Sequence, residues 1–159
     1  VKCIVVTGDS VKSGQSVPHA WNIVDIDGEP YQLDVTWDIG TAKSRKIIYD
    51  YFNLTDSLIN LEHRAENILP KCNKSSANYF VKAKCDFHTR YGLSRYIQKQ
   101  IEQEKKEIFF RVNGLLKKEN IIDMINEILR QKYQNTEVTR VGFSYNSNEK
   151  IGVYYIRIN

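Results

Sequence analysis

The feature that most constrains the fold of this chain is an Asp27-Gly28 pair lying between two runs of strand-forming residues. Asp-Gly is a preferred sequence for the two-residue turn of a β-hairpin, because both turn positions need a positive φ angle. The run before the pair covers about residues 18–26, and Tyr31 to Trp37 is predicted to be the returning strand. The sequence therefore predicts an antiparallel hairpin.

This hairpin carries a histidine, His19, and a carboxylate, Asp34. With a two-residue turn, Ile26 pairs with Glu29, and His19 and Asp34 lie diagonally on one face of the hairpin, roughly 7 Å apart. A shift of the register by one residue would place them on opposite faces. Contact between the two side chains therefore requires the predicted register or one that differs from it by an even number of residues.

A histidine paired with a carboxylate is a common part of catalytic sites. The carboxylate holds one ring nitrogen and stabilises the imidazolium, and the other nitrogen can accept a proton from a nucleophile. His19 is therefore a candidate general base, with Asp34 as its orienting partner. One alternative is a structural histidine at the edge of a sheet. Asp38 is a competing carboxylate, because on a continuous strand it would lie on the same face as Asp34.

The composition is that of a globular protein, with 42% hydrophobic and 26% charged residues. The sequence contains no apolar run of the length that spans a membrane, so we predict no membrane segment in this chain. The net charge of +4 is mild, and the lysines alternate with acids, as in residues 102–107. This pattern is typical of a solvated surface, and we predict no binding to nucleic acid.

The three cysteines are an odd number, so at least one has no partner within the chain. Cys3 lies in an apolar β-run, where a buried and unreactive thiol is expected. Cys72 and Cys85 could form a disulfide, although nothing in the sequence requires one. The cysteines therefore leave the compartment open, with a secreted or cell-surface parent protein as one option.

Metal-binding motifs are absent from the sequence, which has no CxxC pair. The three histidines are scattered along the sequence, at His19, His63 and His88. Since metal ligands usually occur at characteristic short spacings, we predict neither a metal ion nor another cofactor.

Other elements of the first half are predicted from apolar patterns and breakers. They are a strand at about residues 2–7, a polar loop at 9–16, a loop at 38–46, a strand at 47–52, a short helix from Thr55 to about His63, and a strand at 77–84.

The second half has a self-contained αβαββ pattern: a helix at 93–105, a strand at 107–112, an amphipathic helix, and two strands near 141–145 and 151–158. The buried stripe of the amphipathic helix is predicted to comprise Ile121, Ile122, Ile125, Ile128 and Leu129. We expect a three-stranded sheet with two helices against one face. The predicted fold class is α+β, with domains at residues 1–88 and 89–159.

The hairpin motifs resemble those of the bacterial transglutaminase-like superfamily. They are His19-Ala20-Trp21-Asn22, like the HAWN-type strand that carries the family's histidine, and Asp34-Val35-Thr36-Trp37-Asp38, like its DVTWD-type strand. The stretches at residues 3–8 and 51–56 are also similar to that family, and the resemblance extends over about residues 1–85. It implies a transglutaminase-like antiparallel β core for the first domain, and it favours Asp34 over Asp38.

The resemblance also implies a papain-like triad of cysteine, histidine and aspartate, with His19 as base and Asp34 as its partner. Such enzymes form a thioester with a glutamine or amide acyl donor of a protein or peptide, and pass the acyl group to an amine or to water. The family nucleophile lies upstream, at the start of a helix, where its thiol pKa is lowered.

No segment like that nucleophile helix occurs in this sequence, which begins in an apolar β-run without an initiating methionine. We therefore expect a truncated domain, the C-terminal part of a transglutaminase-like acyltransferase or of a peptide or amide hydrolase. It would carry the catalytic His19 and Asp34 but lack the cysteine, and it would be inactive alone. The alternative is a non-catalytic cell-surface or protein-interaction module on the same fold. The oligomeric state is left open.

Overall fold

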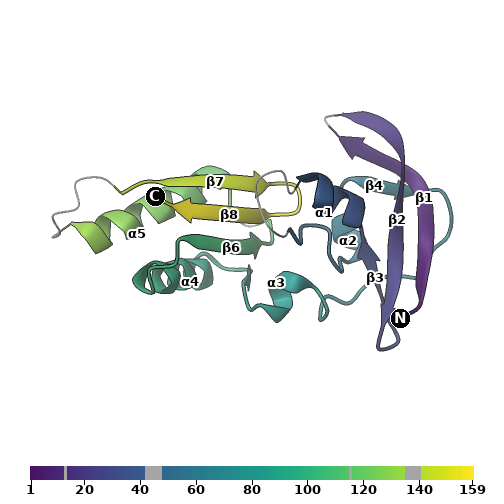
Figure 1. Cartoon of the computed structure of the whole chain (residues 1–159), viewed down its shortest axis with the longest axis horizontal. Coiled ribbons are helices and arrows are strands. Elements are labelled where there is room, and N and C mark those ends of the chain that lie inside the picture. The colour runs from purple at the N-terminus through teal and green to yellow at the C-terminus, as the bar shows by residue number, and fades with distance from the viewer. Residues whose placement is uncertain (13, 42–47, 115, 135–140) are drawn as a thin grey trace. The chain divides into compact units, whose positions relative to one another are not determined.

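A computed structural model describes residues 1–12, 14–41, 48–114, 116–134 and 141–159 of the chain (Figure 1). Its described part contains five helices and eight strands, the strands forming two four-stranded sheets. The α+β class predicted from the sequence is confirmed. The chain divides into two compact units, Val1–Lys82 and Ala83–Asn159. No helix among the described residues has both the length and the apolar character needed to cross a membrane.

The sheet of the first unit is antiparallel throughout, with strand order β3-β2-β1-β4. Its strands are β1 (Cys3–Lys12), β2 (Gln15–Ile26), β3 (Glu29–Leu33) and β4 (His63–Ala65). Figure 1 shows β1 and β2 as one long curved hairpin. The predicted loop at residues 9–16 is therefore wrong for most of its length. Most side chains there are exposed, so polar residues occupy the strands and no apolar alternation marks them.

The β2–β3 hairpin has the predicted register, with Ile26 opposite Glu29. Asp27 and Gly28 have φ angles of 55° and 82°, as a two-residue turn requires. The Gly28 amide also donates to Asp25 Oδ1 at 2.9 Å.

The returning strand ends at Leu33, which differs from the prediction of a strand up to Trp37. Helix α1 (Val35–Thr41) follows directly, and the Asp34 side chain caps it by accepting a hydrogen bond from the Trp37 amide at 3.0 Å. The predicted loop at 38–46 is thus helical up to residue 41, and residues 42–46 lie outside the described part.

Two further predictions in the first unit are wrong, and a third is confirmed only in part. Helix α2 (Asp56–Ile59) follows Thr55 as predicted but ends early, so that His63 lies on β4. The predicted strand at 47–52 consists of turns and irregular backbone over its described residues 48–52, and helix α3 (Tyr79–Lys82) replaces the strand predicted at 77–84. Short apolar runs of this kind do not distinguish strands from other buried segments.

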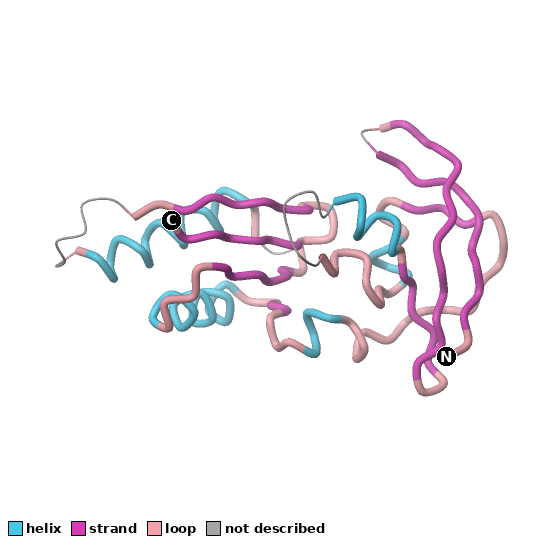
Figure 2. Tube along the Cα trace, in the orientation of Figure 1, coloured by secondary structure: helices cyan, strands magenta, loops and turns pink. Residues whose placement is uncertain are grey.

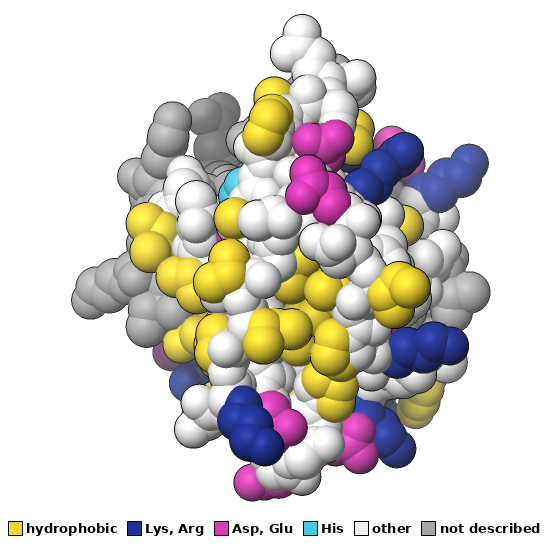
Figure 3. All heavy atoms as spheres, turned by 90° about the vertical axis from the view of Figure 1, so that its right-hand side faces the viewer, with side chains coloured by type: hydrophobic (Ala, Val, Ile, Leu, Met, Phe, Trp, Pro, Cys, Tyr) yellow, Lys and Arg dark blue, Asp and Glu magenta, His cyan; other side chains and the backbone are white. Residues whose placement is uncertain are grey.

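The inner face of the first sheet packs Val6, Trp21 and Ile23 against Cys72. Val5 points to the opposite face from its neighbour Val6 and is exposed. Ile4 and Val17 lie near the starts of β1 and β2 and are exposed as well. The face of the molecule seen in Figure 3 carries apolar side chains grouped near its centre.

The second unit contains, in chain order, β5 (Asp86–Phe87), α4 (Arg90–Glu102), β6 (Glu107–Val112), α5 (Lys118–Tyr133), β7 (Phe143–Asn148) and β8 (Val153–Ile158). The predicted αβαββ order is confirmed from α4 onward (Figure 2). The sheet order is β5-β6-β8-β7, so the two-residue β5, parallel to β6, adds a fourth strand to the predicted three. On α5, Met124 is buried and Ile122 only half-buried, while the other four predicted stripe residues are buried.

Candidate functional site

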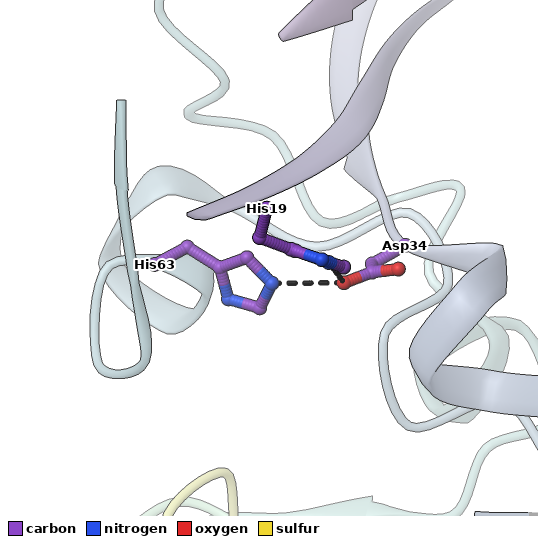
Figure 4. Close-up of side chains that lie close together, drawn as sticks. All are labelled: His19, Asp34 and His63. Carbon is purple, nitrogen blue, oxygen red and sulfur yellow. Dashed lines mark hydrogen bonds and ion pairs between the residues drawn. The ribbon is translucent and has the colours of Figure 1, made fainter. Parts of the chain in front are cut away.

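The site comprises three side chains from three elements of the first unit: His19 of β2, Asp34 between β3 and α1, and His63 of β4 (Figure 4). His19 Nε2 lies 2.7 Å from Asp34 Oδ2, and His63 Nε2 lies 2.8 Å from the same oxygen. The predicted contact between His19 and Asp34 is therefore confirmed. His63 is a third member that the sequence reasoning missed.

The two histidines lie on the two strands that flank β1 in the sheet. It pairs with β2 and β4, with Gly8 opposite His19 and Ser10 opposite His63. The approach of β4 depends on Gly8, because a Cβ atom there would lie 2.1 Å from the carbonyl oxygen of Arg64. A glycine at this position therefore allows β4 to bring His63 to the site.

Substituting Gly8 by alanine is expected to reduce the free energy of unfolding of the first unit by about 2–3 kcal/mol, because the methyl group would push the β4 backbone away. Gly40→Ala is the matched control. A Cβ atom added at Gly40, in α1, would meet no atom of the described residues within 4 Å, so alanine there should be neutral or stabilising. Urea denaturation followed by tryptophan fluorescence measures both. Equal stability of the two variants would contradict the role given to Gly8.

The carboxylate of Asp34 is fully buried, as is the side chain of His63, whereas the side chain of His19 is 13% exposed. Burial opposes ionisation of Asp34. The hydrogen bonds from His63, His19 and the Trp37 amide outweigh this effect and hold the pKa of Asp34 below its usual value. Asp34 is therefore an anion at neutral pH.

Since an ionised carboxylate only accepts hydrogen bonds, both imidazoles donate to Asp34 from Nε2. The neutral ring of His19 then has an unprotonated Nδ1, and this ring is the partly exposed one. His63 Nδ1 is buried without a hydrogen-bond partner among the described residues. His19 can therefore accept a proton from a reacting group, and His63 is enclosed.

The competing carboxylate, Asp38, has a different hydrogen-bond partner. It lies one turn into α1, and its Oδ1 accepts a hydrogen bond from the Tyr51 amide at 2.9 Å. Burial raises the pKa of Asp38 to about 7, and the neighbouring carboxylates of Asp50 and Asp34 add to this. Asp34 is thus the carboxylate that receives the imidazole hydrogen bonds.

The raised pKa of Asp38 makes the stability of the first unit depend on pH. The folded state binds this proton more tightly than the unfolded state, so the contribution of Asp38 is favourable below about pH 4 and is lost as the pH rises through about 7. Asp38→Asn should therefore be more stable than the wild type at pH 8, by roughly 2 kcal/mol, with a smaller difference at pH 4.5. Urea denaturation at both pH values measures this, and a difference independent of pH would contradict the assignment.

Each of the three cysteines lacks a property that a nucleophile acting with His19 needs. Cys3 is exposed, contrary to the expected burial, and it is the first residue of β1. It pairs with Val24, while His19 pairs with Gly8, about 16 Å further along the strand.

The other two cysteines are buried and free, so the disulfide between Cys72 and Cys85 is not formed. Burial, with a contribution from Asp56, raises the pKa of Cys72 to about 12. Burial and the charge of Asp86 raise the pKa of Cys85 to about 11. Both groups are therefore thiols, the unreactive form, at neutral pH.

The donor set of the site could in principle hold a metal ion, because His19, Asp34 and His63 each offer one ligand atom and these atoms lie within 4.8 Å of one another. The scattered sequence positions of His19 and His63 gave no indication of this cluster. Two observations favour hydrogen bonds over metal ligation. The N–O distances of 2.7 and 2.8 Å are those of hydrogen bonds. In addition, a metal-bound histidine normally donates its other N–H group, and His63 Nδ1 has no acceptor among the described residues.

Comparison with models of known protein families found no match, and comparison with curated proteins found no similar sequence. A functional proposal for this chain therefore depends on the geometry of the site and on its hairpin motifs.

Proposed function

We propose that this chain carries the base and the orienting carboxylate of a transglutaminase-like cysteine acyltransferase or peptide or amide hydrolase. The observation that supports this most is the 2.7 Å hydrogen bond between a partly exposed imidazole, His19, and a fully buried carboxylate, Asp34. Both residues lie in the HAWN and DVTWD motifs on which the resemblance to that superfamily depends.

In the proposed reaction, His19 Nδ1 accepts the proton of a cysteine thiol while Asp34 stabilises the resulting imidazolium. The thiolate attacks the carbonyl carbon of a glutamine or amide donor. His19 then protonates the departing nitrogen as the C–N bond breaks, leaving a thioester. An amine or a water molecule, deprotonated by His19, attacks the thioester, and the cysteine leaves with its proton restored.

The thiol in this scheme comes from outside the 159 residues, because Cys3 is distant along β1 and Cys72 and Cys85 are buried thiols. This makes the proposal testable with two lengths of chain. One is the 159-residue chain, and the other, the extended chain, also contains the residues encoded directly upstream.

The test measures incorporation of dansylcadaverine into a glutamine-containing peptide, together with release of ammonia, which also reports hydrolysis. The extended chain should turn over and react with iodoacetamide at one cysteine in addition to those labelled in the 159-residue chain, where Cys3 is exposed. The 159-residue chain should show no turnover. An upstream sequence without a cysteine, or an extended chain without turnover, would contradict the proposal. Turnover by the shorter chain would contradict the external origin of the nucleophile.

The second candidate is a non-catalytic protein-interaction or cell-surface module. It is favoured by one observation: Asp34 is held by His63 as well as by His19, an arrangement that would also serve to lock three elements together. In that case His19 variants would alter stability, and the extended chain would lack acyl transfer.

A further inference from the structure

Among the described residues, three groups donate hydrogen bonds to the Asp34 carboxylate, and the one contributed by His63 has no counterpart in a triad of cysteine, histidine and aspartate. We propose that His63 is a positioning residue, whose Nε2–H holds the Asp34 carboxylate in the orientation that His19 requires. This inference rests on the proposed function for its catalytic meaning. Its structural part can be tested on the 159-residue chain without any activity.

The orientation of the carboxylate is set by two donors other than His19. The Trp37 amide donates to Oδ1 at 3.0 Å, and His63 Nε2 donates to Oδ2 at 2.8 Å. These donors come from α1 and β4, so each oxygen is held by a different element. The carboxylate therefore keeps its direction when His19, the partly exposed partner, gains or releases a proton.

The ring of His63 is enclosed, and among the described residues it is hydrogen-bonded through Nε2 alone. Its ring centroid lies 4.6 Å from that of Trp37, 5.0 Å from that of Trp21 and 5.8 Å from that of Tyr51. A second proton would be on Nδ1, which is buried and has no acceptor among the described residues. Burying a charged donor without a partner is costly, so His63 is a fixed N–H donor and takes no part in proton transfer.

The hydrogen bond from His63 is also the largest of the effects that favour the ionised form of Asp34 against its burial, which raises the pKa. The titratable groups that act on Asp34 are His63 and His19, and Asp38 lies close enough in α1 to interact electrostatically with it. Removing the N–H of His63 alone should therefore raise the pKa of Asp34. Replacing it by another N–H donor should not.

The test is a pH titration of the Asp34 carboxyl group by ¹³C NMR in His63→Leu and His63→Gln, because the glutamine amide can occupy the place of Nε2–H. We expect the pKa of Asp34 to rise by about one pH unit in His63→Leu and to stay close to the wild-type value in His63→Gln. An unchanged pKa in the leucine variant, or equal changes in both variants, would overturn the proposal.

A second measurement needs no substitution and holds even if the leucine variant fails to fold. Long-range ¹H–¹⁵N NMR of the wild-type chain at neutral pH should show His63 as the Nε2–H tautomer. An Nδ1–H tautomer or a charged His63 would overturn the assignment. So would stoichiometric binding of Zn²⁺ that removes the Nε2–H signal, because His63 would then be a metal ligand.

The catalytic meaning is tested in the extended chain. We expect His63→Leu to lower kcat about tenfold with little change in KM, and His63→Gln to restore most of kcat. An active extended chain whose kcat does not respond to His63→Leu would overturn the positioning role. If the NMR results are as expected and the extended chain has no turnover, the proposed function fails while the contact from His63 to Asp34 stands.

Discussion

Replacing His19 by glutamine is expected to lower kcat/KM of the extended chain for amine incorporation by about a thousandfold or more. Glutamine can still donate a hydrogen bond to Asp34, so the buried carboxylate keeps a partner. It has no group that titrates near neutral pH, so it can neither accept the thiol proton nor protonate the leaving nitrogen. The loss should therefore appear in turnover, with a smaller effect on folding.

The matched control is His88→Gln, because His88 is the histidine of the second unit and its side chain is 63% exposed. This variant should retain wild-type turnover. The rate of iodoacetamide labelling of the upstream cysteine in the extended chain should fall in His19→Gln and stay unchanged in His88→Gln, since an imidazole close to the thiol favours the reactive thiolate. Undiminished turnover in His19→Gln would exclude His19 as the base.

Replacing Asp34 by alanine is expected to reduce the free energy of unfolding of the first unit by about 3–5 kcal/mol. The substitution leaves the Nε2–H of the buried His63 without an acceptor and breaks the bond to His19. It also removes the cap of α1, because the Trp37 amide loses its bond to Oδ1. Three elements are thus affected by one change.

Tryptophan fluorescence is well suited to this measurement. The two tryptophans of the chain, Trp21 and Trp37, both belong to the first unit, so the signal in a urea titration reports that unit alone. Glu29→Gln is the control, because it removes an exposed carboxylate from the same hairpin and should change stability by less than about 0.5 kcal/mol. Comparable effects of the two substitutions would show that the hydrogen bonds to Asp34 contribute little to the free energy of unfolding of the first unit.

The parts of the structure that were predicted correctly have local causes. The Asp27-Gly28 turn determines the hairpin register, because both residues accept a positive φ angle and the strands on either side are paired from the turn outward. The register in turn brings His19 and Asp34 within reach of each other. In the second unit, long periodic segments such as α5 make the element order visible in the sequence.

The parts that were missed depend on tertiary contacts or on very short elements. Residues 35–37 have β-branched and aromatic side chains typical of a strand, and the cap from Asp34 to Trp37 turns this segment into a helix. His63 lies on a strand of three residues, which is too short for alternation to show. Its place in the site follows from pairing with β1, and no local pattern around residue 63 predicts that pairing.

The two histidines also differ in how far along the chain they lie from Asp34, by 15 residues for His19 and by 29 for His63. The shorter segment contains the tight β2–β3 turn, whereas the longer one passes through α1 and α2 before β4 joins the edge of the sheet. Closing a longer loop costs more chain entropy, and a three-residue strand adds few contacts to offset it. During folding we therefore expect Asp34 to meet His19 first, and the arrival of β4 with His63 to complete the site last.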